Sequence, residues 1–335
     1  MNRERSGEIK TIGQSGGFDG SVLPELSVML PTYNRSDALL RTLRALEEQT
    51  TETASYEIIV VDDGSMDNTP DLLLRFSERT GARFAYAVLK KNGGPARARN
   101  VGLSMVRSRA VLILGDDIEP AANLVEKHLT YHREYSDDRD ALLGYVSFPK
   151  GLHPDGFMRW LEQDGRKYFF NYAELYSGEE AGPLFFYTCN VSVKMSLLEK
   201  SGWFDESFPY ASHEDLELGY RLADQGMRLI YDSTAEGFHW HMLTVQGITR
   251  RVYLMGYSAM LFWSKVRQAD GMVKRAARRI LSLFCSAPWG VFFWNQLRNR
   301  RYPDTEASPV QWQLLLFFSF FIGLADAYRN REIRL

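Results

Sequence analysis

Two pairs of adjacent carboxylates follow apolar runs, where they could bind a cation or a polar ligand. Asp62-Asp63 comes after EIIVV, and Asp116-Asp117 comes after VLIL and Gly115. Adjacent acids at the end of a buried strand repel each other and lose hydration unless a cation or hydrogen bonds compensate. At Asp116-Asp117, hard oxygen ligands of this kind suit Mg²⁺ or Mn²⁺ bridging phosphates, and the alternative is a solvated turn at the strand end. At Asp62-Asp63 the carboxylates could accept hydrogen bonds from a base N–H and from ribose hydroxyls, and the alternative is an Asp-Gly turn with a helix cap.

Two histidine-containing motifs are also candidates for chemistry. His213-Glu214-Asp215 precedes the helical pattern LELGYRL. The helix dipole favours acids in the first turn of a helix, so helix capping is the structural alternative for this motif. His239-Trp240-His241 follows a strand. In an extended chain the two imidazoles point to opposite faces, so one is a candidate metal ligand, and the sequence does not say which.

A glycine-rich turn, Asn92-Gly93-Gly94-Pro95, leads into a basic segment that contains Arg99. An arginine at this place could reach a nucleotide base or a phosphate. The alternative is an exposed helix start.

The elements that position these motifs alternate between two periodicities. Short apolar runs predict strands, and leucines at helical spacing after Ser36 or Asp37 predict the first helix. The predicted strands are 26–31, 58–61, 84–89, 111–114 and 227–232, and further helices are expected at about 69–79, 95–106 and before Gly226. Alternating strands and helices indicate an α/β fold with a parallel sheet covered on both faces. Ligands bind such sheets at the carboxyl ends of the strands.

The stretch from Gly144 to Tyr187 is rich in aromatic residues and glycines and has no clear period. We interpret it as a substrate-facing insertion or long loops that select the acceptor.

Composition narrows the class of protein. The chain has 335 residues, and 40 Lys and Arg against 42 Asp and Glu give a formal net charge of -2, which argues against nucleic-acid binding. Only Cys189 and Cys285 occur, so a disulfide framework is not expected and a reducing cytoplasm fits. Residues 1–25 are charged and Gly-rich without a secretory apolar run, and they are expected to form a disordered leader.

Near the C-terminus two apolar stretches carry basic flanks. Ile280 to Leu297 reaches the minimum length of a spanning helix but contains Pro288, and Val310 to Ala325 is shorter than a span requires. The flanks are Lys274, Arg275, Arg278, Arg279, Arg298, Arg300 and Arg301. The pattern suits either the surface of a membrane or helices packed on the catalytic domain or in a homo-oligomer interface.

Taken together and in this order, PTYNR, VVDDGS, NGGPARARN, LGDD, HEDLELGYRL and FHWH resemble the family 2 glycosyltransferases with the GT-A fold. The resemblance covers roughly Leu26 to Ala259. It divides the chain into a leader (1–25), a GT-A catalytic domain (26–259) and a helical C-terminal extension (260–335). It implies a Rossmann-like, mostly parallel sheet.

The resemblance also implies an activity. Such enzymes are mostly inverting and use a nucleoside diphosphate sugar with Mg²⁺ or Mn²⁺. Here a UDP- or dTDP-sugar donor and a hydroxyl acceptor, lipid-linked or otherwise, are expected. The implied setting is polysaccharide or cell-envelope synthesis in the cytoplasm or at the inner face of the cell membrane.

The resemblance assigns roles to individual residues. Asp215 matches the catalytic base, with Glu214 beside it. Asp117 matches a ligand of the metal, and His239 matches a ligand of the metal or the diphosphate. The residues that match the binding site for the donor nucleotide are Pro31, Thr32, Tyr33, Arg35, Asp63, Arg99 and Asp116, with Asp116 near the ribose.

Two departures from the family pattern matter. Gly115 replaces the first Asp of the DxD motif, which leaves the metal more dependent on Asp117 and the diphosphate. No QxxRW motif follows, which argues against a processive synthase. A dehydrogenase or P-loop fingerprint is also absent from the sequence. The remaining rival is a catalytically idle sugar-nucleotide-binding or partner-binding protein on a transferase fold.

Overall fold

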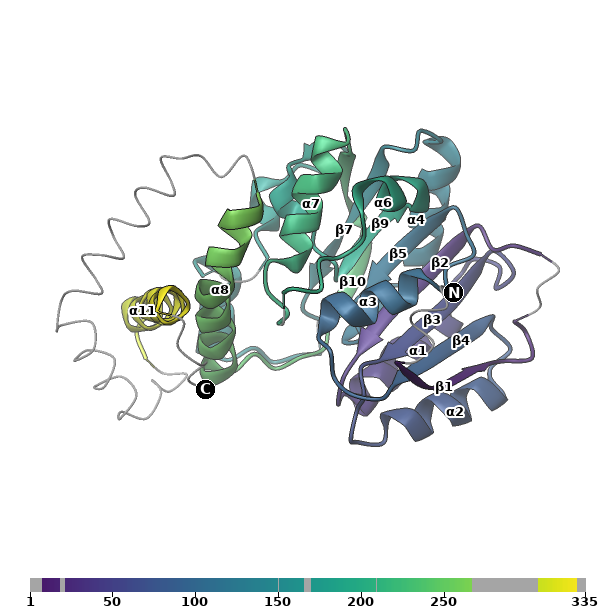
Figure 1. The fold of residues 1–335 in the computed structure, drawn as a ribbon, viewed down its shortest axis with the longest axis horizontal. Coiled ribbons are helices and arrows are strands. Elements are labelled where there is room, and N and C mark those ends of the chain that lie inside the picture. Colours follow the sequence, from purple (N-terminus) through teal and green to yellow (C-terminus); the bar gives the residue numbers. More distant parts are fainter. Residues whose placement is uncertain are drawn as a thin grey trace. The chain divides into compact units, whose positions relative to one another are not determined.

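A computed structural model describes residues 8–18, 22–149, 151–165, 170–208, 210–266 and 307–329. The chain divides into two compact units (Figure 1). The first contains residues 1–150 and 172–240, and the second contains residues 151–171 and 241–335.

The first unit is built on one sheet, which has ten strands within the described residues. They are β1 (Ile9–Gln14), β2 (Leu26–Thr32), β3 (Tyr56–Asp62), β4 (Phe84–Leu89), β5 (Ala110–Leu114), β6 (Ile118–Pro120), β7 (Asp140–Ser147), β8 (Glu180–Ala181), β9 (Asn190–Lys194) and β10 (Arg228–His239). Their order is β1-β4-β3-β2-β5-β9-β7-β10-β6, and β8 pairs with β10. The strands β4-β3-β2-β5 are parallel, as are β7 and β10, while β9 runs antiparallel between the two groups.

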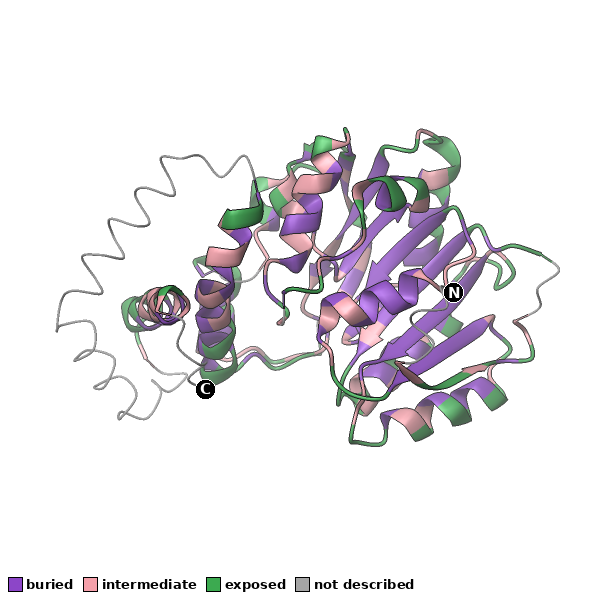
Figure 2. Ribbon diagram, in the orientation of Figure 1, coloured by how far each residue is buried: buried purple, intermediate pink, exposed green. Residues whose placement is uncertain are grey.

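Helices connect many of the strands along the chain. They are α1 (Ser36–Glu47), α2 (Thr69–Arg79), α3 (Pro95–Leu103), α4 (Leu124–Glu134), α6 (Met195–Ser201) and α7 (Glu214–Asp224), with the 3-10 turns η3 (Tyr172–Glu174) and η4 (Pro183–Phe185). The central strands are almost wholly buried, the edge strand β1 is mostly exposed, and the helices expose their outer faces (Figure 2). Strands buried on both faces need apolar residues at every position, which explains the continuous apolar runs of the sequence.

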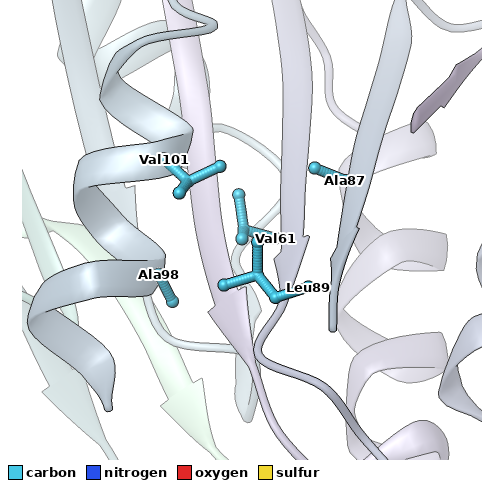
Figure 3. Packing of buried hydrophobic residues seen from close by; sticks show 5 residues of the cluster. All are labelled: Val61, Ala87, Leu89, Ala98 and Val101. Carbon is cyan, nitrogen blue, oxygen red and sulfur yellow. The ribbon is translucent and has the colours of Figure 1, made fainter. Parts of the chain in front are cut away.

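Alternate residues of each strand face opposite sides of the sheet, and one side packs against α3. Val61, Ala87 and Leu89 from β3 and β4 meet Ala98 and Val101 of α3 (Figure 3). Gly102 of α3 lies so close to β2 that a Cβ there would be 2.6 Å from Cγ of Met29. The small residues of α3 therefore hold this helix directly on the sheet.

The predicted α/β architecture is confirmed, with corrections at several boundaries. α3 ends at Leu103 rather than near Val106, and β10 extends beyond 232 to His239. The irregular tract from Gly144 to Tyr187 contains the end of β7, a short helix α5 (Gly156–Gln163), β8 and both 3-10 turns.

The expectation of a disordered leader over 1–25 is wrong for the segment that forms β1. This edge strand pairs antiparallel with β4, from Ile9 opposite Leu89 to Gln14 opposite Ala85. Gly13 lies against Tyr86, where a Cβ would be 2.5 Å from the ring. A glycine that suggested flexibility thus permits a close approach.

In the described part of the second unit, α8 (Val245–Lys265) and α11 (Pro309–Tyr328) pack closely and α5 packs on α11. A Cβ at Gly256 would collide with the carbonyl of Phe320, and a Cβ at Gly323 with the carbonyl of Tyr253. The ring centres of Trp312 and Phe157 lie 5.4 Å apart. The predicted end of the catalytic domain at 259 falls inside α8, and the apolar stretch from Ile280 to Leu297 lies outside the described residues.

Candidate active site

Strand ends bring most of the predicted site residues to one edge of the sheet. β2 ends at Thr32, β3 ends at Asp62, and Asp116 lies two residues beyond the end of β5. β6 begins directly after Asp117 and pairs antiparallel with the end of β10, so that Ile118 lies opposite His239. This pairing brings a histidine from the end of the sheet to the Asp-Asp motif.

Asp116 is held from three sides. Thr32 Oγ1 donates to its Oδ2 at 2.7 Å, Arg35 Nη1 donates to its Oδ1 at 3.2 Å, and Thr42 Oγ1 donates to its carbonyl at 2.9 Å. The residue is 6% exposed. Burial and, next, the charge of Asp117 raise the pKa of Asp116 above its ordinary value. The side chain is therefore fixed before any ligand arrives.

Asp117 faces both a cation and a histidine. Its Oδ2 accepts from Arg35 Nη1 at 2.6 Å and lies 3.4 Å from His239 Nε2. The backbone N–H of Trp240 donates to the carbonyl of Asp117 at 3.1 Å. His239 is buried, whereas His241 is exposed and belongs to the second unit. Of the two histidines, His239 is the one beside the carboxylates.

This pair of groups fits a divalent cation. Adjacent ligands of an octahedral Mg²⁺ or Mn²⁺ lie about 3 Å apart when each bond is about 2.1 Å long. The observed 3.4 Å between Asp117 Oδ2 and His239 Nε2 is close to that separation, and the Arg35 guanidinium already places positive charge against the same oxygen. Within the described ranges no group of three or more His, Cys, Asp or Glu side chains could hold a metal ion. Two protein ligands would therefore leave positions for diphosphate oxygens and water.

Gly115 stands where the family motif has its first Asp, and the structure shows a steric reason. A Cβ at this position would lie 2.9 Å from Cγ1 of Ile118 and 3.1 Å from Oδ1 of Asp117. The N–H of Gly115 also donates to the carbonyl of Cys189 at 3.1 Å. A side chain here would press on the carboxylate that follows it.

Asp63 holds the glycine-rich turn. Its Oδ1 and Oδ2 accept the backbone N–H groups of Gly93 at 2.9 Å and Gly94 at 2.8 Å. Burial raises the pKa of Asp63 to about 6, against the lowering effect of these two hydrogen bonds. Gly64 has a φ of 74°, and a Cβ there would lie 2.7 Å from the backbone of Lys91. The turn that contains Asp63 and Gly64 and the turn that contains Gly93 and Gly94 are thus held together by hydrogen bonds and close packing, and they form one continuous surface.

The segment after β2 is fastened to the same surface. Asn34 has a left-handed φ of 52°, its N–H donates to Ser65 Oγ at 2.7 Å, and its Oδ1 accepts from the N–H of Met66 at 2.8 Å. Pro31 is half-buried, and Tyr33 is 41% exposed. Strain at a non-glycine residue is often found at a functional site, where neighbouring contacts maintain it.

Arg99 and Glu214, assigned separately to the nucleoside and to catalysis, contact each other. Arg99 Nη1 donates to Glu214 Oε1 at 2.7 Å, and their side chains are 11% and 3% exposed. The guanidinium carbon of Arg99 also lies 5.2 Å from the ring centre of Phe204. This ion pair joins α3 to the first turn of α7.

Asp215 occupies the first turn of α7 and is half-buried, while the neighbouring Glu214 is buried. Its Oδ1 accepts the N–H of Leu216 at 2.8 Å. His213, immediately before the helix, has a left-handed φ of 69°. Of the two acids, Asp215 is the one with access to solvent.

Sequence reasoning missed several residues that build the site. Asn100 fixes the loop before α7, since its Nδ2 donates to the carbonyl of Phe204 at 2.8 Å and its Oδ1 accepts the N–H of Phe204 at 2.9 Å. Arg41 lies with its guanidinium carbon 4.4 Å from the ring centre of Trp240. The polar Arg99-Asn100 pair inside a helix that packs on a sheet was the available signal.

Comparison with known proteins identifies the family. Residues 27–199 match the family model described as glycosyl transferase family 2, which is more than half of the chain. The chain belongs to glycosyltransferase family 2. Its sheet and helices have the GT-A fold of that family.

Two curated relatives and one solved structure illustrate the family. The chain is 32% identical over 228 residues to validoxylamine A glucosyltransferase of Streptomyces hygroscopicus subsp. jinggangensis, covering 62% of this chain and 53% of that protein. It is 29% identical over 232 residues to chondroitin synthase of Escherichia coli, covering 61% of this chain and 33% of that protein. The chain therefore spans about half the length, or less, of these relatives.

The fold resembles a mannosyltransferase from Pyrobaculum calidifontis, PcManGT, solved in complex with GDP-Man and Mn²⁺. The TM-score is 0.60 at 18% sequence identity, and the match covers 94% of this chain and 90% of that one. At this sequence identity, the similarity between the two structures shows a shared fold only.

Proposed function

We propose that this family 2 protein is an inverting, metal-dependent glycosyltransferase that moves a sugar from a nucleoside diphosphate sugar to a hydroxyl acceptor. The observation that carries the proposal is the arrangement of Asp117, His239 and Asp116 at the carboxyl edge of the sheet, with Thr32 and Arg35 holding the carboxylates. An acidic pair held by hydrogen bonds at this edge is suited to a nucleotide and its cation.

Asp215 is the proposed catalytic base. Its carboxylate takes the proton from the acceptor hydroxyl as the hydroxyl oxygen attacks the anomeric carbon. The bond from that carbon to the donor oxygen breaks, and the nucleoside diphosphate leaves with the electron pair. Attack from the side opposite the leaving group inverts the anomeric configuration. The first turn of α7 is suitable for this role because Asp215 is half-buried and keeps access to solvent.

Asp117 and His239 would hold a divalent cation, and that cation would neutralise the negative charge on the leaving diphosphate. Asp116 and Thr32 would orient the ribose, since Thr32 already fixes the carboxylate of Asp116. The interlocked turns of Asp63 and Gly93 would receive the base, beside Pro31 and Tyr33. Arg99 contributes to this arrangement through Glu214, because its guanidinium is paired with that acid.

A panel of UDP-, dTDP- and GDP-sugars tests this proposal, with thermal shift in Mn²⁺ as the first readout. UDP- or dTDP-sugars are expected to stabilise the protein most. Transfer to a hydroxyl acceptor, with the anomeric configuration of the product determined by NMR, then tests inversion. Donor binding without hydrolysis or transfer would favour the idle sugar-nucleotide-binding alternative.

We also propose that the second unit contacts the cytoplasmic face of a membrane, close to a lipid-linked acceptor. Pro309–Tyr328 is one helix, among the described residues, that is long and apolar enough to span a membrane by length and composition alone. Its residues Val310, Leu314 and Phe317 recur at helical spacing and are 66%, 50% and 41% exposed. Basic residues in the sequence between α8 and α11 would add attraction to anionic lipid.

A further inference from the structure

Arg35 occupies the place where positive charge is most needed. Its Nη1 donates to Asp116 Oδ1 at 3.2 Å and to Asp117 Oδ2 at 2.6 Å, and so it bridges two adjacent carboxylates. Like charges at this separation repel strongly in a partly buried environment. The guanidinium therefore stabilises the pair in the structure described here.

Arg35 lies on the solvent side of this cluster. Its side chain is 44% exposed, whereas the side chains of Asp116 and Asp117 are 9% and 12% exposed. It directly precedes α1 and is not part of the helical backbone. The arginine can consequently leave the carboxylates by rotating toward solvent, without disturbing the packed sheet.

The same carboxylate oxygen serves both the arginine and the candidate metal site. Asp117 Oδ2 is 2.6 Å from Arg35 Nη1 and 3.4 Å from His239 Nε2. A divalent cation bound to this oxygen would stand within a few ångströms of the guanidinium, and the two positive groups would repel. Arginine and metal therefore compete for one ligand atom.

We propose that Arg35 is an exchangeable counter-ion, which neutralises Asp116 and Asp117 when no metal is bound and is displaced when a divalent cation binds. The released guanidinium is then free to donate to the diphosphate of the donor, for which its planar fork of N–H groups is suited. This inference rests on the proposed function, because it assumes that Asp117 holds the cation. It makes Arg35 a coupling residue between metal and diphosphate rather than a fixed nucleotide ligand.

Direct Mn²⁺ binding tests the exchange, with the free ion followed by electron paramagnetic resonance in the absence of nucleotide. Arg35→Met should bind Mn²⁺ more tightly than the wild type by roughly 2- to 5-fold, about what the loss of a partly exposed ion pair is worth. Arg35→Lys should lie between the two. Arg44→Met removes the same charge from an exposed position of α1 and controls for net charge.

A second readout is the affinity for UDP and GDP in saturating Mn²⁺, measured by calorimetry. Arg35→Met should bind the diphosphate more weakly although it binds the metal more tightly, a reversal that a merely structural role would not produce. Thermal unfolding should show a larger Mn²⁺-induced stabilisation in this variant than in the wild type, which also verifies that the variant folds.

Unchanged or weaker Mn²⁺ binding in Arg35→Met, or equal tightening in Arg44→Met, would overturn the exchange. Asp117→Asn separates this failure from failure of the proposed function. If Asp117→Asn abolishes Mn²⁺ binding while Arg35→Met has no effect, the metal site stands and the exchange is wrong. If Asp117→Asn binds Mn²⁺ as the wild type does, the metal assignment itself is wrong.

Discussion

At the scale of single residues, Glu214 and Asp215 show how two neighbouring acids acquire different roles. Glu214 is 2% exposed and paired with Arg99, whereas Asp215 is half-buried at the start of α7. A buried carboxylate held by an arginine is poorly placed to accept a proton from a substrate, while one with solvent access can do so. The environments favour Asp215 as the base.

Replacing Asp215 by Asn should preserve the fold and donor binding and reduce turnover by roughly 10²- to 10⁴-fold, the usual contribution of a general base. Asp224→Asn, at the exposed far end of the same helix, is the matched control and should leave turnover unchanged. Near wild-type turnover in Asp215→Asn would remove this residue from the mechanism.

The raised pKa of Asp63 leads us to expect that acid weakens nucleotide binding without unfolding the protein. Burial raises its pKa to about 6 in the folded protein, from an ordinary value of 3.8. Between these two values the folded state takes up a proton that the unfolded state does not, so this group opposes acid unfolding as the pH falls. Protonation nevertheless removes the charge that accepts the N–H groups of Gly93 and Gly94.

Nucleotide affinity should therefore weaken as the pH falls through about 6, while the thermal unfolding temperature shows no matching fall. Calorimetric titration with UDP or GDP in saturating Mn²⁺ and a thermal scan at each pH measure the two quantities. A parallel decline of affinity and unfolding temperature across this range would contradict the role of Asp63.

At the scale of elements, the glycine turn and α3 connect three parts of the first unit. Gly93 and Gly94 bind Asp63 after β3, Arg99 binds Glu214 on α7, and Asn100 binds the loop that precedes α7. A segment that resembles a simple helix start in the sequence thus sets the position of both the proposed nucleotide surface and the proposed base.

Arg99→Met should lower the free energy of unfolding by about 3–5 kcal/mol, because Glu214 is left buried without its partner. The double variant Arg99→Met, Glu214→Leu should recover most of that stability, yet its turnover should remain about 10²-fold below the wild type if the pair orients the first turn of α7. Denaturant unfolding and steady-state kinetics measure the two effects.

The exposed pair of Arg133 and Glu25 provides a control of the same chemistry. Its side chains are 51% and 47% exposed, so Arg133→Met should cost at most about 1 kcal/mol. Full recovery of turnover in the double variant would show that the buried pair serves stability alone.

Elements that are buried on both faces were predictable from the sequence, and elements defined by distant pairing were not. β4 and β5 are apolar throughout, and β2 and β3 contain the continuous apolar runs 28–31 and 58–61. β1 is mostly exposed and owes its existence to pairing with β4, between Ile9 and Leu89 at one end and Gln14 and Ala85 at the other, so its own composition gives no signal.

The site shows the same division. The residue types and their places at strand ends were predictable, because carboxylates after apolar runs are visible in the sequence. Their partners were not: Arg99 and Glu214 are 115 positions apart, and Arg35 and Asp117 are 82 positions apart. No local pattern records which of several nearby groups a charged side chain will choose.

At the scale of the whole molecule, α11 gives a membrane prediction. Full-length protein should float with anionic vesicles, and added salt should release it only in part, since the basic residues contribute about 1 kcal/mol each and apolar burial is insensitive to salt. Leu314→Glu with Phe317→Glu should reduce flotation. Gln313→Glu, at an exposed polar position of the same helix, is the control for added charge.

Wild-type protein that stays at the bottom of the gradient would indicate instead that the outer face of α11 packs against protein. A dimer in light scattering that dissociates in the Leu314→Glu, Phe317→Glu variant would identify an interface between copies of the chain.

Nucleotide binding with and without metal tests whether Asp117 holds a cation needed to bind the donor while Asp215 is needed only for transfer. Calorimetric titration with the nucleoside diphosphate of the preferred donor, with Mn²⁺ and then with EDTA, should be run on wild type, Asp117→Ala and Asp215→Asn. We expect Mn²⁺-dependent binding in the wild type and in Asp215→Asn, and weak, EDTA-insensitive binding in Asp117→Ala. Equal affinity in Mn²⁺ and EDTA for the wild type, with turnover also unaffected by EDTA, would show that Asp117 holds no cation needed for donor binding.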